Sequence, residues 1–207
     1  KLQDASLYKG KYYLYFGTTP VIVLYIPYRL ITKSSIPDGL AVLIFSFASF
    51  VLSVFILFFL VKKVFTNVPQ WMLLLTIMVL GFGNFAPYNL RRTEIYEVAI
   101  SCGSFFLMGS VYLFIKAFEK EKTNSIFLLI GSLFLGLAVG ARPQSALSGL
   151  LLPFLALKLF RNKISIKSFL TKEVLFLFLP FVISLLCIFE YNFLRFDSPF
   201  EFGQRYQ

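Results

Sequence analysis

Histidine is absent from this 207-residue sequence, and charged residues make up only 14 % of it. Without histidine, this segment cannot form a Ser-His-Asp triad, a His-ligated haem or the usual His-containing zinc sites. The two cysteines, Cys102 and Cys187, lie in apolar stretches. A thiol there behaves as a small hydrophobic group, so neither cysteine indicates a disulfide or a metal site. Acid–base chemistry in this segment therefore falls to carboxylates, lysine or tyrosine.

Low charge is matched by high hydrophobicity, with 58 % hydrophobic residues and a mean hydropathy of +0.79. Soluble domains carry about 25 % charged residues, so the composition predicts an all-α integral membrane protein. A spanning helix needs roughly 17–25 apolar residues. Six stretches come close to this length and predict six transmembrane helices: Leu40–Val61, Trp71–Leu90, Ile95–Ile115, Ser125–Ala141, Pro143–Phe160 and Val174–Leu194.

The apolar stretch Thr18–Ile31 is shorter and contains Pro20 and Pro27, which favours an interfacial or re-entrant segment over a span. The predicted organisation is an extracytoplasmic loop with this segment over residues 1–39, a six-helix bundle over 40–194, and the start of another extracytoplasmic loop over 195–207. The sequence opens without an initiator Met and stops without a terminal tail. We therefore expect both ends to be truncated.

Cations are sorted between the two sides of the predicted bundle. The connectors assigned to the cytoplasm by the positive-inside tendency carry Lys62, Lys63, Lys116, Lys120, Lys122, Arg161, Lys163, Lys167 and Lys172. The opposite side holds every other arginine: Arg29, Arg91, Arg92, Arg142, Arg195 and Arg205. A planar guanidinium suits phosphate better than an ammonium does, so this pattern predicts an outer face that binds phosphate. The alternative is that these arginines reach lipid headgroups or pair with nearby acids.

The net charge of +10 does not indicate a nucleic-acid partner. Lysines on the cytoplasmic side lie near anionic lipid, and this location explains much of the excess.

The run from Arg91 to Glu97 holds two cations and two carboxylates between two apolar stretches. Charges so close to hydrocarbon are unfavourable unless they are paired or functional. Beyond the arginine pair, polar residues recur at helical spacing, which predicts a polar face directed into a bundle cavity. That face consists of Glu94, Glu97, Ser101, Ser104 and Met108.

The stretch 136–143 carries two further patterns. Gly136 and Gly140 form a small-xxx-small pair, which predicts a close helix contact. Arg142 precedes Pro143, a residue suited to the first position of a helix. A helix N-terminus attracts anions, so Arg142 is a candidate phosphate ligand. The alternative role is a single topological anchor.

Three segments resemble the bacterial GT-C superfamily of membrane glycosyltransferases, in the protein-mannosyltransferase-like group (glycosyltransferase family 39-like). They are Asp4–Gly17 followed by Pro20, Arg195–Gly203, and the weaker match Gly140–Pro143. The resemblance implies a GT-C-like multi-pass bundle in the bacterial plasma membrane. It also implies transfer of a sugar from a polyprenyl-phosphate donor to a glycan, lipid or protein acceptor on the extracytoplasmic face.

The resemblance also implies roles for particular residues. Carboxylates accept the proton of the attacking hydroxyl or orient the acceptor, and cations hold the lipid phosphate. The acids are Asp4, with Glu94 and Glu97 as further candidates; the phosphate ligands are Arg91, Arg92 and Arg142; Lys11 and Tyr12 line the acceptor cleft. The resemblance leaves open whether the main acid lies upstream of Lys1. Some relatives use a divalent metal, but no ligand spacing here defines a metal site, and no other cofactor is predicted.

Two alternatives do not involve glycosyl transfer. One is a multi-span transporter or lipid flippase in which the carboxylates Glu94, Glu97 and Glu190 bind or couple a substrate. The polar residues gather at one face of the membrane instead of its midplane, which argues against this class. The other alternative is a non-catalytic membrane scaffold whose charges only set its topology.

Overall fold

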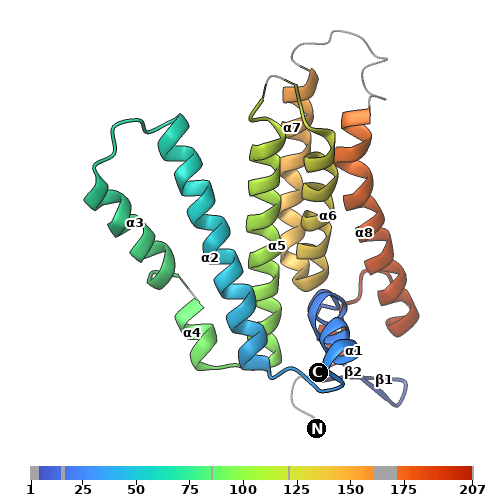
Figure 1. Ribbon diagram of the computed structural model, residues 1–207. Helices are drawn as coiled ribbons and strands as arrows, with labels where there is room; N and C mark the ends of the chain where they lie inside the picture. The colour runs from blue at the N-terminus through green and yellow to red at the C-terminus, as the bar shows by residue number, and fades with distance from the viewer. Residues whose placement is uncertain (1–4, 15–16, 85, 121, 161–171, 207) are drawn as a thin grey trace.

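The computed structural model describes residues 5–14, 17–84, 86–120, 122–160 and 172–206, which form a helical bundle with a small β-hairpin at one end (Figure 1). In chain order, the elements before the bundle are β1 (Ala5–Tyr8), β2 (Lys11–Leu14), a π-helical turn (Val21–Tyr25) and α1 (Ile26–Thr32). The remaining elements are α2 (Asp38–Lys63), α3 (Gln70–Phe82), α4 (Ala86–Arg91), α5 (Ile95–Ala117), α6 (Ser125–Ala141), a 3-10 helix (Pro143–Leu150), α7 (Leu151–Phe160), α8 (Lys172–Phe196) and a 3-10 turn (Gln204–Tyr206).

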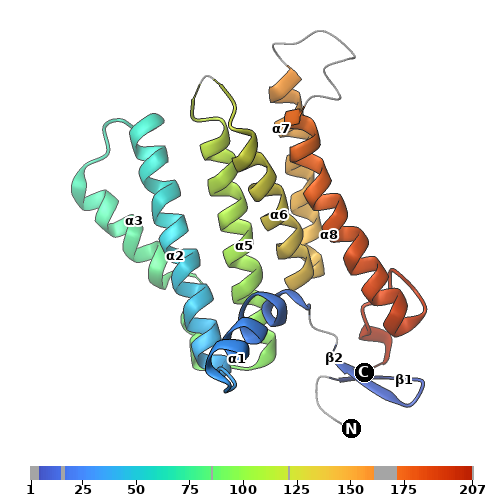
Figure 2. The same ribbon diagram turned by 45° about the vertical axis from the view of Figure 1, so that its right-hand side comes forward.

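Helices α2, α5, α6 and α8 pack side by side in this order, so α6 lies between α5 and α8 (Figures 1 and 2). Two apolar clusters hold them together. The first, where α2, α5 and α6 meet, includes Val42, Phe45, Cys102, Phe106 and Ala138. The second, among α5, α6, α7 and α8, includes Phe114, Leu135, Leu152, Leu177 and Phe181. Many large apolar side chains remain on outer faces of the helices, as hydrocarbon surroundings require.

Four helices are long and apolar enough to cross a membrane: Asp38–Lys63, Ile95–Ala117, Pro143–Phe160 and Lys172–Phe196. These match four of the six predicted spans and confirm the all-α class. The stretch Ser125–Ala141 also forms a helix, α6, as predicted. At 1.5 Å per residue, its 17 residues extend for about 26 Å.

The prediction of one continuous helix over Trp71–Leu90 is wrong. Helix α3 ends at Phe82, and α4 begins only at Ala86. Asn84 accounts for the break, because its side chain donates to the Leu80 carbonyl oxygen at 2.6 Å and accepts from the Ala86 backbone N–H at 2.7 Å. These side-chain bonds replace helical backbone bonds. The chain therefore enters α4 as a separate short helix.

The predicted interfacial segment is a short helical stretch at the end of the bundle where α2 begins (Figure 2). Val21–Thr32 is too short to cross a bilayer. The segment is fastened to α6 by Thr19, whose hydroxyl donates to the Leu137 carbonyl oxygen at 2.8 Å. A methyl group on Gly140 would lie 2.5 Å from the Thr19 Oγ1 atom, so this contact needs glycine. Gly136 contacts Ser184 of α8, which confirms the predicted close helix contact at that position.

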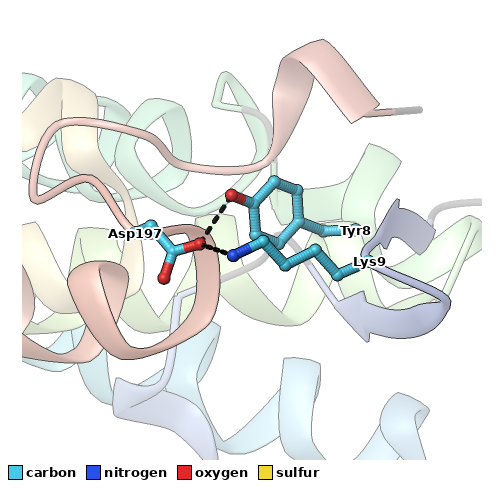
Figure 3. Close-up of polar contacts among 3 residues, drawn as sticks. All are labelled: Tyr8, Lys9 and Asp197. Carbon is cyan, nitrogen blue, oxygen red and sulfur yellow. Dashed lines mark hydrogen bonds and ion pairs between the residues drawn. The ribbon is translucent and has the colours of Figure 1, made fainter.

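The hairpin of β1 and β2 turns at Lys9 and Gly10, both with positive φ, and docks on residues 197–206. Ser6 donates its hydroxyl to the Gly203 carbonyl oxygen at 2.6 Å. Tyr8 donates to an Asp197 carboxylate oxygen at 2.7 Å, and Lys9 forms an ion pair with the same oxygen (Figure 3). We call the hairpin together with residues 197–206 the terminal clasp. It joins two of the three segments on which the family resemblance rests.

Candidate functional site

A cavity of about 660 Å³ lies where α4, the first half of α5 and the turn after α6 meet. It is at the end of the bundle that also carries α1 and the terminal clasp (Figure 1). Its wall combines charged, aromatic and amide side chains with an apolar portion. The lining residues are Tyr88, Asn89, Arg92, Tyr96, Glu97, Ile100, Gly103, Ser104, Leu107, Arg142, Gln144 and Ser145.

The turn between α4 and α5 places Arg92 at the mouth of this cavity. Its Nη2 donates to Glu94 Oε2 at 2.9 Å, and its Nε lies 3.8 Å from Glu97 Oε1. The hydrogen bond and charge of Glu94 raise the pKa of Arg92, and Arg92 in turn lowers the pKa of Glu94. Both Arg92 and Glu94 are more than half exposed, so this pair orients the guanidinium and adds little stability.

Glu97 differs from Glu94 in its surroundings, although the two are only three residues apart. Its side chain is 3 % exposed, and its Oε2 atom is buried without a hydrogen-bond partner within the described part of the chain. A buried carboxylate is unfavourable unless its oxygens are satisfied. Glu97 is therefore a lining residue of the cavity with an enclosed acceptor oxygen that has no hydrogen-bond partner among the described residues.

Arg142 reaches the cavity from the turn between α6 and the 3-10 helix. A methyl group on Gly103 would lie 3.3 Å from the Arg142 Cγ atom, so the Arg142 stem crosses α5 at a position that has no side chain. The guanidinium lies over the Tyr96 ring, 4.4 Å from its centroid, and its Nη2 donates to the Tyr96 hydroxyl at 3.0 Å. Tyr96 thus holds Arg142 by a cation–π contact and a hydrogen bond.

A buried polar network supports the wall behind these charges. Asn89 of α4 donates its amide to the Ser101 hydroxyl at 3.3 Å, and Ser46 of α2 donates to the same hydroxyl at 3.2 Å. Glu97 and Ser104 line the cavity, while Ser101 is buried in this network. The predicted polar face of α5 is therefore confirmed in part: Glu97, Ser101 and Ser104 lie in or behind the cavity wall, whereas Glu94 and Met108 do not line the cavity.

Toward the middle of the bundle the α5 wall of the cavity becomes mainly apolar, with Ser104 as its polar member. Ile100, Gly103 and Leu107 continue the α5 wall that Glu97 begins. Ten residues separate Glu97 from Leu107, which corresponds to about 15 Å along a helix. The cavity wall consequently runs from charged side chains at one end to mainly apolar side chains over about this length.

Three of the predicted site residues meet in the cavity: Arg92, Glu97 and Arg142. Glu94 pairs with Arg92 but is not part of the lining. The other predicted substrate ligands, Arg91, Lys11 and Tyr12, are exposed and do not line the cavity. Asp4 lies outside the described residues.

Several lining residues were not predicted. Tyr88 and Asn89 were assigned to a continuous apolar span, and only the break at Asn84 brings them to the cavity as part of α4. Pro87, close behind the paired glycines Gly81 and Gly83, is the sequence feature that could have indicated this break. Other lining residues that the prediction missed are Tyr96, Gln144 and Ser145.

The arginines of the described chain gather at the cavity end. Arg29, Arg91, Arg92, Arg142, Arg195 and Arg205 all lie on elements or turns at this end. Lys62 and Lys63 are the last two residues of α2, at the opposite end of the bundle. Their charges contribute there to lowering the pKa of Glu119, which follows α5. The predicted sorting of cations is thus reproduced for these residues; Arg161, Lys163 and Lys167 lie outside the described part.

Within the described ranges, no group of three or more Cys, Asp or Glu side chains is placed to hold a metal ion. Arginine, tyrosine and amide groups instead supply hydrogen-bond donors to the cavity. Together these features describe a pocket at one end of a helical bundle, lined by two arginines, one buried carboxylate, several uncharged polar side chains and an apolar portion.

Comparison of the chain with protein-family models, with curated proteins and with solved structures found no match.

Proposed function

We propose that the protein is a multi-pass glycosyltransferase of the bacterial plasma membrane with a GT-C-like bundle. In this proposal it transfers a sugar from a polyprenyl-phosphate donor to a glycan, lipid or protein acceptor on the extracytoplasmic face. The observation that carries the proposal is the presence of both Arg92 and Arg142 in the lining of one cavity, which also has an apolar portion. A lipid phosphate has the matching distribution of charge and hydrocarbon.

The chemistry of transfer requires cations that stabilise a phosphate and a carboxylate that accepts a proton. An acceptor hydroxyl attacks the anomeric carbon, the bond from that carbon to the phosphate oxygen breaks, and the oxygen leaves with the electron pair. Guanidinium groups stabilise the negative charge on the departing phosphate. A carboxylate accepts the hydroxyl proton, so histidine is not required. We assign this proton to Asp4, as the family resemblance implies, and the phosphate to Arg92 and Arg142.

The transporter or flippase hypothesis receives less support from the carboxylates it invokes. Glu190 is exposed on α8 and does not line the cavity. Glu94 is 54 % exposed, which leaves Glu97 as the one buried carboxylate of the three. The two lining arginines outnumber the single buried acid, and this excess of positive charge suits binding of an anion better than coupling to a cation.

The test is transfer of radiolabelled sugar from polyprenyl-phosphate donors in membranes that contain the full-length protein. Arg142→Ala removes a charged hydrogen-bond donor worth about 1.5–3 kcal/mol, so we expect kcat/KM to fall roughly 10- to 100-fold. Arg29→Ala is the matched control, because Arg29 is an exposed arginine at the same end and outside the cavity lining. Equal transfer by both variants would contradict the assignment of the cavity. Absence of transfer from every donor, together with movement of the lipid across the membrane, would favour a flippase.

A further inference from the structure

From the burial and position of Glu97 we infer that this residue recognises the sugar of the donor lipid, as a hydroxyl-binding specificity residue, while Arg92 and Arg142 bind the phosphate. This inference rests on the proposed function and deepens it. It assigns the cavity to the glycosylated carrier in preference to the carrier phosphate alone. It also gives Glu97 a role separate from proton transfer.

The first argument is the unused acceptor. Glu97 is almost fully buried, yet its Oε2 atom has no hydrogen-bond partner within the described residues. Its Oε1 atom is 3.8 Å from Arg92 Nε, beyond hydrogen-bond distance. A buried carboxylate in this state is best satisfied by a ligand that donates hydrogen bonds.

The second argument is the chemistry of the neighbouring groups. Arg92 and Arg142 supply only hydrogen-bond donors, so they bind the oxygens of a phosphate. The Glu97 carboxylate supplies only acceptors and repels phosphate oxygens. A ligand that satisfies all three side chains must therefore combine an anionic group with hydrogen-bond donors nearby. A sugar joined to a lipid phosphate has this combination, and a free carrier phosphate lacks the sugar hydroxyls.

A purely structural role for Glu97 makes a different prediction. If Glu97 only holds Arg92 in place, its replacement should weaken binding of every phosphate-bearing lipid to the same extent. Glu94 provides the matched control for this role. It forms the shorter ion pair with Arg92, at 2.9 Å, but lies outside the cavity lining.

The experiment measures binding of two kinds of lipid to the purified full-length protein: a short-chain polyprenyl phosphate, and its mannosyl and glucosyl phosphodiesters. For Glu97→Gln we expect affinity for the better-bound glycosylated lipid to fall roughly tenfold, because the amide loses the negative charge and replaces one acceptor oxygen with a donor. Affinity for polyprenyl phosphate should hold or rise, because a negative charge near the phosphate is gone. Glu94→Gln should change both affinities by the same factor.

The ratio of the two affinities is taken within one variant, so a reduced folded fraction does not alter it. An unchanged ratio in Glu97→Gln would overturn the inference while leaving the proposed function intact. A wild-type protein that binds none of the lipids would overturn the proposed function itself. A changed ratio in Glu97→Gln and an unchanged ratio in Glu94→Gln would together support sugar recognition by Glu97.

Discussion

Replacing Gly136 with alanine tests the packing of the central helix directly. Gly136 lies where α6 meets α8, and a methyl group there would overlap the Cβ and Oγ atoms of Ser184. Excess volume in a packed interface costs about 1–3 kcal/mol. Alanine is favoured over glycine in a helix by about 1 kcal/mol, which offsets part of this loss. The overlap involves a Cβ atom that cannot rotate away, so we expect the upper range and a net destabilisation of about 1–2 kcal/mol.

The assay is thermal unfolding of the purified protein in detergent. For a chain of this size, each kcal/mol shifts Tm by roughly 2–4 °C, so Gly136→Ala should lower it by roughly 2–8 °C. Gly81→Ala in α3 is the matched control, because a methyl group there would lie 3.4 Å from the Phe50 ring, an ordinary contact. Its Tm should hold or rise.

A second substitution distinguishes overlap from other causes. Ser184→Gly removes the atoms that the new methyl group would meet, so Gly136→Ala/Ser184→Gly should be more stable than the sum of the single changes predicts. We expect a coupling energy of about 1–3 kcal/mol between the two positions. Strictly additive effects, or a Gly136→Ala protein as stable as Gly81→Ala, would refute the packing argument.

Two further predictions concern the cavity and the terminal clasp. Tyr96→Phe keeps the ring under Arg142 but removes a hydrogen bond worth about 1 kcal/mol, so KM for the lipid donor should rise roughly fivefold; Tyr96→Leu should raise it a further two- to fivefold, and identical KM values in steady-state kinetics would contradict this role. Hydrogen bonds from Lys9 and Tyr8 lower the pKa of Asp197, so its stabilising contribution is present above the ordinary aspartate pKa of about 3.9 and is lost as the pH falls through the lowered value. Hydrogen exchange of residues 5–14, corrected for intrinsic rates, should therefore increase as the pH falls below about 4, and should show no such increase in Asp197→Asn.

Composition and hydropathy were sufficient to predict the helical class and most helix positions. Apolar runs such as Leu40–Val61 and Val174–Leu194 correspond closely to α2 and α8, because a helix that spans hydrocarbon must be apolar over a fixed length. The spacing of Glu97, Ser101 and Ser104 likewise predicted a polar face of α5, because helical periodicity alone determines which residues share a face.

The break between α3 and α4 was not predictable from hydropathy. Averaging over Trp71–Leu90 conceals its few polar residues, and the break depends on the hydrogen bonds that one of them, Asn84, forms through its side chain. The prediction of the cavity lining missed Tyr88 for the same reason, since Tyr88 reaches the cavity only as part of α4. Arg142 was predicted as a phosphate ligand from its position before Pro143, but its contact with Tyr96 joins residues 46 positions apart and follows only from the packing of α5 on α6.

The terminal clasp has a consequence for the order of assembly. Its partners are far apart in the chain: Tyr8 and Asp197 are separated by 189 positions, and Ser6 and Gly203 by 197. During synthesis from the N-terminus, the hairpin is made first, but its docking surface does not exist until α8 has been completed. Such long-range contacts form slowly because the intervening chain must be ordered first. The clasp can therefore close only after the chain has been made through residues 197–206, which makes its closure a late step that follows synthesis of α8.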